Sequence, residues 1–184
     1  MFAGLAWIFL ADLSGRTLVR LQPLGPVRRS TLLAVKHALV ENLGAQVTTV
    51  SQTAIPNSAW YGPRKRYRAD RLLTYLAPMA RGRGTTLGIT RSDISTTKGS
   101  VRDWGVFGLG QMPGHAAVIS SFRLGRNSDK LMALVAVHEV GHNLGLPHCP
   151  TPRCIMNDAE GSKRHLDEAT SLCPSCRRKL GLTR

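Results

Sequence analysis

One short segment of the chain carries residue types that can bind a metal ion and hydrolyse a bond. Residues 138–149 read HEVGHNLGLPHC, in a region whose apolar spacing predicts a helix over about 130–144. His138 and His142 are four residues apart, so their imidazoles project from one helix face and can bind one Zn²⁺. Glu139 lies about 100° further round that helix, where its carboxylate can face a zinc-bound water without binding the metal.

Gly145 and His148 extend this motif. A glycine three residues after His142 can adopt the left-handed conformation that ends a helix, and the resulting turn lets His148 approach as a third ligand. Three neutral imidazoles leave a fourth position on zinc for water, whose pKa can then fall to about 7. A chance match to the five fixed positions in a chain of this length is on the order of one in 10⁵. The motif therefore predicts His138, His142 and His148 as zinc ligands and Glu139 as the catalytic base.

The cysteines of the chain all follow the histidine motif, at positions 149, 154, 173 and 176. Such paired spacing is typical of a tetrahedral thiolate zinc site, and the alternatives are two disulfides or a redox-active Cys-x-x-Cys. Met156 comes eight residues after His148. A methionine downstream of the extended histidine motif, in a Met-turn, is characteristic of the metzincin metallopeptidases.

The histidine motif, fused to the frame C-x(4)-C-x-M and followed by C-x(2)-C, resembles the archaemetzincins, a family of metzincin zinc metallopeptidases. The resemblance covers about residues 17–182 and is most specific in 138–176. It implies a second, structural zinc bound by Cys149, Cys154, Cys173 and Cys176, and so two Zn²⁺ per chain. It also implies an α+β, zincin-like fold, in which a twisted mixed sheet with helices lies above a cleft and the zinc helix forms its floor. The substrate would be a peptide or protein that pairs with an outer strand, here expected near 106–109.

Alternating strand and helix patterns must position these residues. The sequence predicts strands at 17–22, 46–50, 87–90, 104–109 and 116–122, and helices at 30–43, 67–76 and 130–144. A last helical segment is expected from about 167 to the final cysteine pair. We expect residues 17–145 to form an N-terminal subdomain with the sheet and active-site helix. Residues 146–184 would form a C-terminal subdomain with the Met-turn and four-cysteine zinc site, which is too small to hold a core without metal. Residues 1–16 are an apolar lead-in of unassigned role.

The composition indicates one globular domain with an unusual charge. The chain has 184 residues, 42% of them apolar, and 25 Lys and Arg against 11 Asp and Glu give a net charge of +14.

The densest basic run, residues 64–91, contains one acid, Asp70, and Tyr61 and Tyr67 interleave with its arginines. Aromatic residues among basic ones are a feature of nucleic-acid surfaces. We favour a solvated helix face for this run, with a preference for acidic peptides and nucleic-acid binding as the alternatives.

No stretch approaches the roughly 18–20 uninterrupted apolar residues of a membrane span, so we expect no transmembrane segment. A zinc–thiolate site fits a reducing interior, which favours a cytoplasmic location. The apolar run at residues 2–10 leaves export through an atypical N-terminal signal as the alternative. We expect a monomer.

Two functions of different class remain at this point. The first is a zinc-dependent metallopeptidase in which Glu139 assists a zinc-bound water. The second is a non-catalytic basic binding protein that uses a zincin-like fold as a scaffold. The first is favoured because a scaffold has no need of a non-ligating acid beside the metal.

Overall fold

The structure is a computed structural model that describes residues 16–80, 82, 84–125, 128–158 and 163–182. The apolar run at residues 2–10 lies outside these residues. Among the described residues, no helix combines the length and the apolar character needed to cross a membrane.

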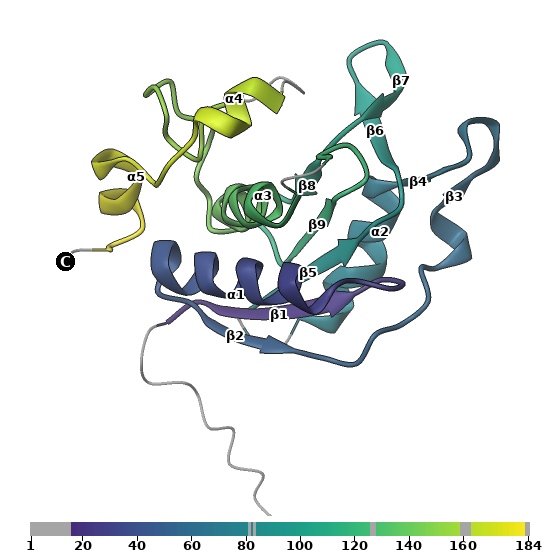
Figure 1. Ribbon diagram of the computed structural model, residues 1–184, viewed down its shortest axis with the longest axis horizontal. Coiled ribbons are helices and arrows are strands. Elements are labelled where there is room, and N and C mark those ends of the chain that lie inside the picture. The colour runs from purple at the N-terminus through teal and green to yellow at the C-terminus, as the bar shows by residue number, and fades with distance from the viewer. Residues whose placement is uncertain (1–15, 81, 83, 126–127, 159–162, 183–184) are drawn as a thin grey trace, which may run out of the picture.

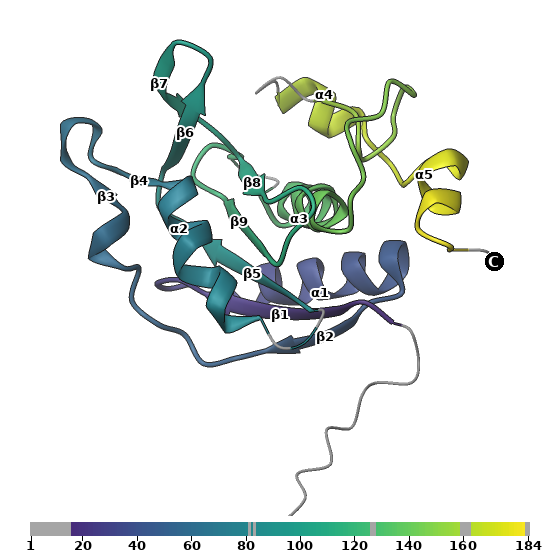
Figure 2. The ribbon, with the colours of Figure 1, turned by 180° about the vertical axis from the view of Figure 1, so that it is seen from behind.

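A five-stranded sheet forms the centre of the molecule (Figures 1 and 2). Its strand order is β2 (Gln46–Thr49), β1 (Leu18–Pro23), β5 (Thr85–Thr90), β9 (Ala116–Ser120) and β8 (Gly108–Gly110). The first four strands are parallel, and β8 is antiparallel to β9. β8 is therefore an edge strand with one side free of partners within the sheet.

Helices cover both faces of this sheet. Successive residues of a strand point to opposite sides, and β9 carries apolar residues at successive positions, so both faces need cover. Ala117 and Ile119 of β9 join the apolar cluster that contains α1 (Arg29–Leu43) and α3 (Ser128–Asn143). Ala116 and Val118 join the cluster around α2 (Ala69–Leu76). α3 packs between α1 and the sheet on one side and the C-terminal segment on the other, so it is buried on most of its surface.

A smaller sheet stands beside the first. Its order is β3 (Trp60–Tyr61), β4 (Arg66–Arg68), β6 (Ile94–Lys98) and β7 (Val101–Gly105), and β6 and β7 form a hairpin. Ion pairs join the two sheets. Asp93 accepts hydrogen bonds at 2.8 and 2.9 Å from Arg123, which follows β9, and lies 3.1 Å from the guanidinium of Arg66.

Two sequence predictions of elements are wrong at this sheet. The strand expected over 104–109 is two strands, because the N–H of Val106 donates to Ile94 of β6 whereas the carbonyl of Phe107 accepts from Ser120 of β9. The chain changes sheets between those two residues. The helix expected from 67 begins at Ala69, since the two preceding residues pair with β6 as part of β4.

The helix expected from about 167 to the cysteine pair is also wrong. The C-terminal segment contains two short helices, α4 (Lys163–Glu168) and α5 (Pro174–Lys179). Between them the chain is extended, because Thr170 donates to the carbonyl of Arg153 and Ser171 accepts from Ile155. The cysteines are therefore joined to the rest of the segment by backbone pairing and not by a continuous helix.

The first turn of α3 is tied to α1 through Asp129. Its carboxylate accepts hydrogen bonds from Thr31 at 2.5 Å and from Arg28 at 3.0 Å. These contacts set the position of the helix that carries the histidine motif. The Thr31 hydrogen bond is the main cause that holds the pKa of Asp129 below its usual value, and Arg28 adds to it.

We expect Asp129→Asn to lower the free energy of unfolding at pH 7 by about 1 kcal/mol, because the change removes a charged acceptor of two hydrogen bonds. The pKa of Asp129 is lower in the folded protein than in the unfolded chain. Its contribution to the free energy of unfolding is therefore present above the unfolded-state pKa and is lost as pH falls through the folded-state pKa. Urea unfolding of metal-free protein from pH 7 to 3 should therefore show the two curves converging at the acid end. Glu41→Gln, an exposed change on α1, is the control; a gap that stays constant with pH would contradict this role.

Candidate metal centres and active-site cleft

The end of α3 turns the chain back on itself. Gly145 adopts φ +89°, and the N–H of Leu146 donates to the carbonyl of Gly141 at 3.0 Å. His148 then lies with its ring centroid 5.3 Å from that of His138 and 4.9 Å from that of His142. The turn expected at the glycine is confirmed, and it brings the third histidine to the helix.

The three histidines form a cluster that fits a single cation. One ring nitrogen of each lies within 4.8 Å of the others. The Nδ1 atoms of His138 and His142 are 2.7 Å from the carbonyl oxygens of Ile155 and Leu146. A carbonyl can only accept, so each Nδ1 carries the proton, and each Nε2 is left as a lone-pair donor. The two Nε2 atoms face each other at 3.0 Å, an arrangement that a shared cation stabilises.

Burial keeps the imidazoles of His138 and His142 in the neutral form that can bind a metal. It lowers the pKa of His138 to about 4, and it also lowers the pKa of His142. His148 is half-exposed, and its Nδ1 lies 3.5 Å from the carboxylate of Asp158. A carboxylate on the second nitrogen of a ligating histidine is a common means of orienting the ring.

Glu139 lies under the edge strand β8. Its carboxyl is buried, and burial raises its pKa to about 8, although the N–H of Gly110 donates to it and opposes the rise. A Cβ at Gly108 would be 2.6 Å from Oε1 of Glu139, and one at Gly110 would be 2.6 Å from the Glu139 carbonyl oxygen. Only glycine allows the strand to lie this close to the helix.

Met156 packs beneath the histidine helix. A Cβ at Gly141 would be 2.6 Å from its sulfur, so the thioether lies against the helix turn between the two helical histidines. The carbonyl of Met156 accepts from the N–H of Cys149 at 2.8 Å, and Asn157 donates to the Cys149 carbonyl at 2.9 Å. These bonds connect the methionine segment to the loop that carries His148.

The four cysteines converge into one cluster, with their sulfur atoms within 4.8 Å of one another. The sulfurs of Cys149 and Cys173 are 3.7 Å apart, and those of Cys154 and Cys176 are 3.8 Å apart. Both distances are well beyond the roughly 2.05 Å of a disulfide bond, and all four cysteines are free. The arrangement fits a tetrahedral metal ion and does not fit the alternative of two disulfides.

A cleft of about 410 Å³ joins the histidine cluster to both sheets. α3 lies below it, the edge strand β8 and the β6–β7 hairpin border one side, and the segment with α4 borders the other (Figure 1). Apart from the histidines and Glu139, its lining is largely apolar; examples are Phe107, Val135 and Leu166.

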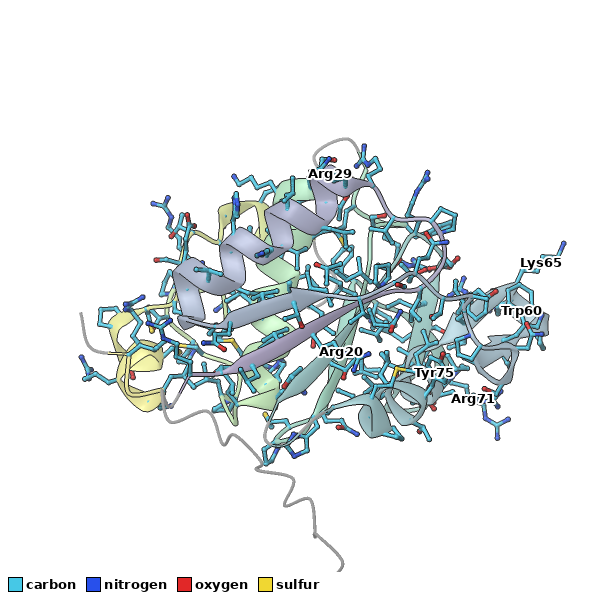
Figure 3. All side chains as sticks on the ribbon, turned by 90° about the horizontal axis from the view of Figure 1, so that it is seen from below. Arg20, Arg29, Trp60, Lys65, Arg71 and Tyr75 are labelled. Carbon is cyan, nitrogen blue, oxygen red and sulfur yellow. The ribbon has the colours of Figure 1, made fainter. Side chains whose placement is uncertain are left out.

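The basic run does not form the helix face that the sequence suggested. Of its residues, Arg71 lies on α2, whereas Arg64 and Arg68 precede this helix. Arg64 lies 3.5 Å from Asp103, and Arg68 lies 3.0 Å from Asp70. Figure 3, which views the molecule from below, shows Lys65 and Arg71 pointing outward beside Trp60. Part of this run is therefore structural, since ion pairs anchor the smaller sheet.

Sequence reasoning missed the two glycines of β8 and the carbonyl partners of the histidines. Gly108 lies inside the strand expected over 104–109 and Gly110 directly follows it, which was a usable signal, because glycine in a strand often marks a close approach of another backbone. Nothing in the sequence marks the carbonyls of Ile155 and Leu146 as the hydrogen-bond partners of the histidines, since every residue carries the same group.

A histidine cluster on a helix at the floor of a cleft, in an α+β fold of this kind, defines the class of zinc metallopeptidases. The sequence profile of peptidase family M54 matches residues 44–182, and the chain belongs to this family. It is 30% identical over 175 residues to the archaemetzincin of Haloarcula marismortui, which covers 88% of this chain and 98% of that protein.

Solved structures agree with this assignment. The archaemetzincin of Archaeoglobus fulgidus, solved in complex with malonate, superimposes with a TM-score of 0.76 at 30% identity and covers 89% of this chain and 99% of its own. The archaemetzincin of Methanopyrus kandleri gives a TM-score of 0.80 at 25% identity, with 94% and 97% covered. The α+β, zincin-like fold that the sequence predicted is thereby confirmed.

Proposed function

We propose that this protein hydrolyses peptide bonds with a zinc ion held by His138, His142 and His148 and with Glu139 as the general base. One observation carries the proposal: three imidazoles converge beside a buried carboxyl in one cleft, and two of them have Nδ1 committed to backbone carbonyls. This leaves lone pairs directed at a common point, as metal binding requires.

Zinc in such a site supplies a Lewis acid that polarises a carbonyl and lowers the pKa of water. Glu139 takes the proton of the attacking water and later delivers it to the leaving amine nitrogen. Its raised pKa gives the carboxyl the proton affinity that this exchange needs. A cation on the neighbouring histidines would favour its ionised form, because opposite charge stabilises the carboxylate. The N–H of Gly110 holds the carboxylate in place.

The substrate in this proposal is an extended peptide that pairs with β8. The support is that β8 is an edge strand and that all three of its residues line the cleft. An edge strand offers unpaired backbone groups to an added strand. In this proposal the peptide pairs with Gly108–Gly110, whereas the sequence predicted an outer strand near 106–109.

A second zinc, bound by the four cysteines, completes the proposal. Burial raises the pKa of the Cys154 and Cys176 thiols, so a cation is needed to hold them as thiolates. Cys149 directly follows His148, and its N–H is bound to Met156. The structural zinc would thus fix the loop that carries the third ligand of the catalytic zinc.

The alternative, a non-catalytic scaffold, gains no support from the site. Such a scaffold would not need a buried acid beneath β8, and burying a carboxyl has an energetic cost. The free thiols of the cysteine cluster support a reducing compartment. Both sites are built from one chain, which supports a monomer as the active unit.

Glu139→Gln tests the role of the carboxyl with an isosteric change. We expect the variant to retain two zinc ions per chain by elemental analysis and to lose at least a hundredfold in kcat on a peptide substrate, since general bases contribute about 10²–10⁴-fold. Glu41→Gln should retain full activity. Undiminished turnover by the Glu139 variant would remove this residue from the mechanism.

Gly108→Ala tests the close approach of β8. The new methyl group would meet the Glu139 carboxyl, so we expect the variant to fold and bind zinc but to lose about tenfold or more in kcat, because small displacements of a catalytic group are costly. Gly62→Ala is the matched control, since its Cβ would have 3.8 Å to the nearest side chain. Equal kcat for the Gly108 variant and wild type would show that the contact does not position Glu139.

The double variant Cys173→Ser/Cys176→Ser tests whether the two sites depend on each other. We expect zinc to be lost from both, with a matching loss of activity, because the His148 loop is no longer held. Ser175→Ala, between the two cysteines, should leave the zinc content at two. A double variant that keeps one zinc and full hydrolysis would show the sites to be independent.

A further inference from the structure

We infer that the β6–β7 hairpin selects substrates that carry a carboxylate, which Lys98 binds at the wall of the cleft. The inference rests on the proposed function, because it concerns the substrate of the same cleft. It adds a chemical preference that the peptidase fold and the metal ligands do not specify.

The hairpin lines the cleft through side chains of both strands. Thr96, Lys98 and Trp104 border the same cleft as the three histidines and Glu139. Within the part of the chain that the structure describes, Lys98 is the one lysine or arginine among the lining residues. A substrate in the cleft therefore meets Lys98 as the one lysine or arginine side chain, on a wall away from Asp158, which lines the same cleft and lies 3.5 Å from His148.

Trp104 restrains the Lys98 ammonium group. The nitrogen lies 5.4 Å from the centroid of the indole ring, within the range of a cation–π contact. Trp104 is 38% exposed, so its ring also offers apolar surface to a bound peptide. Lysine and tryptophan together form a small site for an anionic group with an apolar stem.

The two acids that belong to the hairpin or directly precede it are paired with arginines. Asp103, which precedes Trp104, lies 3.5 Å from both Arg64 and Arg66, and its side chain is 10% exposed. Asp93, which precedes β6, is held by Arg66 and Arg123. No ion pair of Lys98 is found among the described residues, so its charge is available to a ligand.

The hairpin is held in position before a substrate binds. Arg68 of β4 donates to the hydroxyl of Thr97 at 2.9 Å and to the carbonyl of Arg102. The Thr97 hydroxyl also donates to that carbonyl at 3.2 Å, which closes the two strands. A wall that is ordered in advance loses less entropy when it binds a ligand.

The ligand chemistry is a carboxylate, from either an Asp or Glu side chain or the C-terminus of a peptide. An exposed ion pair contributes modestly, so we expect a preference of about threefold to fivefold at low ionic strength. Salt should weaken this preference, because it screens exposed charges.

The experiment uses blocked peptides that are identical except for Glu or its isostere Gln at one position, varied along the peptide. A second set differs only in a free or amidated C-terminus. Two quantities are measured for each peptide: kcat/KM with the zinc-loaded wild-type protein, and Kd with zinc-loaded Glu139→Gln, which does not depend on turnover. The two sets separate a side-chain carboxylate from a terminal one.

Lys98→Gln and Lys98→Glu are made in both backgrounds. We expect wild type to favour the carboxylate at one position in both quantities, Lys98→Gln to lose this preference, and Lys98→Glu to favour the uncharged peptide instead. Lys36→Glu, an equal charge change on the exposed side of α1, should leave the preference intact.

Equal Kd values for the charged and uncharged peptides would overturn the inference, as would a carboxylate preference that survives Lys98→Glu. Failure of the proposed function looks different. In that case wild type would hydrolyse none of the peptides, while the Kd values would still decide whether Lys98 recognises a carboxylate.

Discussion

The geometry of the site depends on two hydrogen bonds from histidine rings to backbone carbonyls. His138 and His142 use Nδ1 to bind Ile155 and Leu146, and this leaves both Nε2 atoms directed at one point. Leu146 lies in the turn that follows α3, and Ile155 adjoins Met156. The orientation of the two rings therefore depends on how α3 ends and on the path of the C-terminal segment. A shift of the loop that carries Leu146 or of the loop that carries Ile155 would rotate an imidazole.

On the upper side of the cleft, one close contact between β8 and α3 has two consequences. β8 lies on α3 at a distance that only glycine tolerates, so the edge strand of the larger sheet also covers the Glu139 carboxyl. Burial raises the pKa of this carboxyl, and the N–H of Gly110 in β8 opposes the rise. In the proposed mechanism, substrate pairing and the proton affinity of Glu139 would both depend on this packing of one strand on one helix.

The high positive charge of the chain has a partly structural explanation. Arg64 and Arg66, two residues apart in the sequence, share the carboxylate of Asp103 within the smaller sheet, and Asp93 pairs with Arg66 and Arg123 where the two sheets meet. Such semi-buried pairs hold the hairpin beside the cleft. Lys98 differs from these arginines, because it lines the cleft beside Trp104 and none of the described carboxylates forms an ion pair with it.

The sequence by itself predicted the histidine cluster, because helical periodicity places His138 and His142 on one face and Gly145 predicts the turn that follows. Most strands and the helices of the first 145 residues were also predictable from apolar spacing. Tertiary structure alone decided where the chain leaves one sheet for the other, since residues 104–109 look like one strand and differ only in their hydrogen-bond partners. It also decided which acids meet the basic run, because those carboxylates come from strands that are distant in sequence and reach the arginines only through sheet pairing.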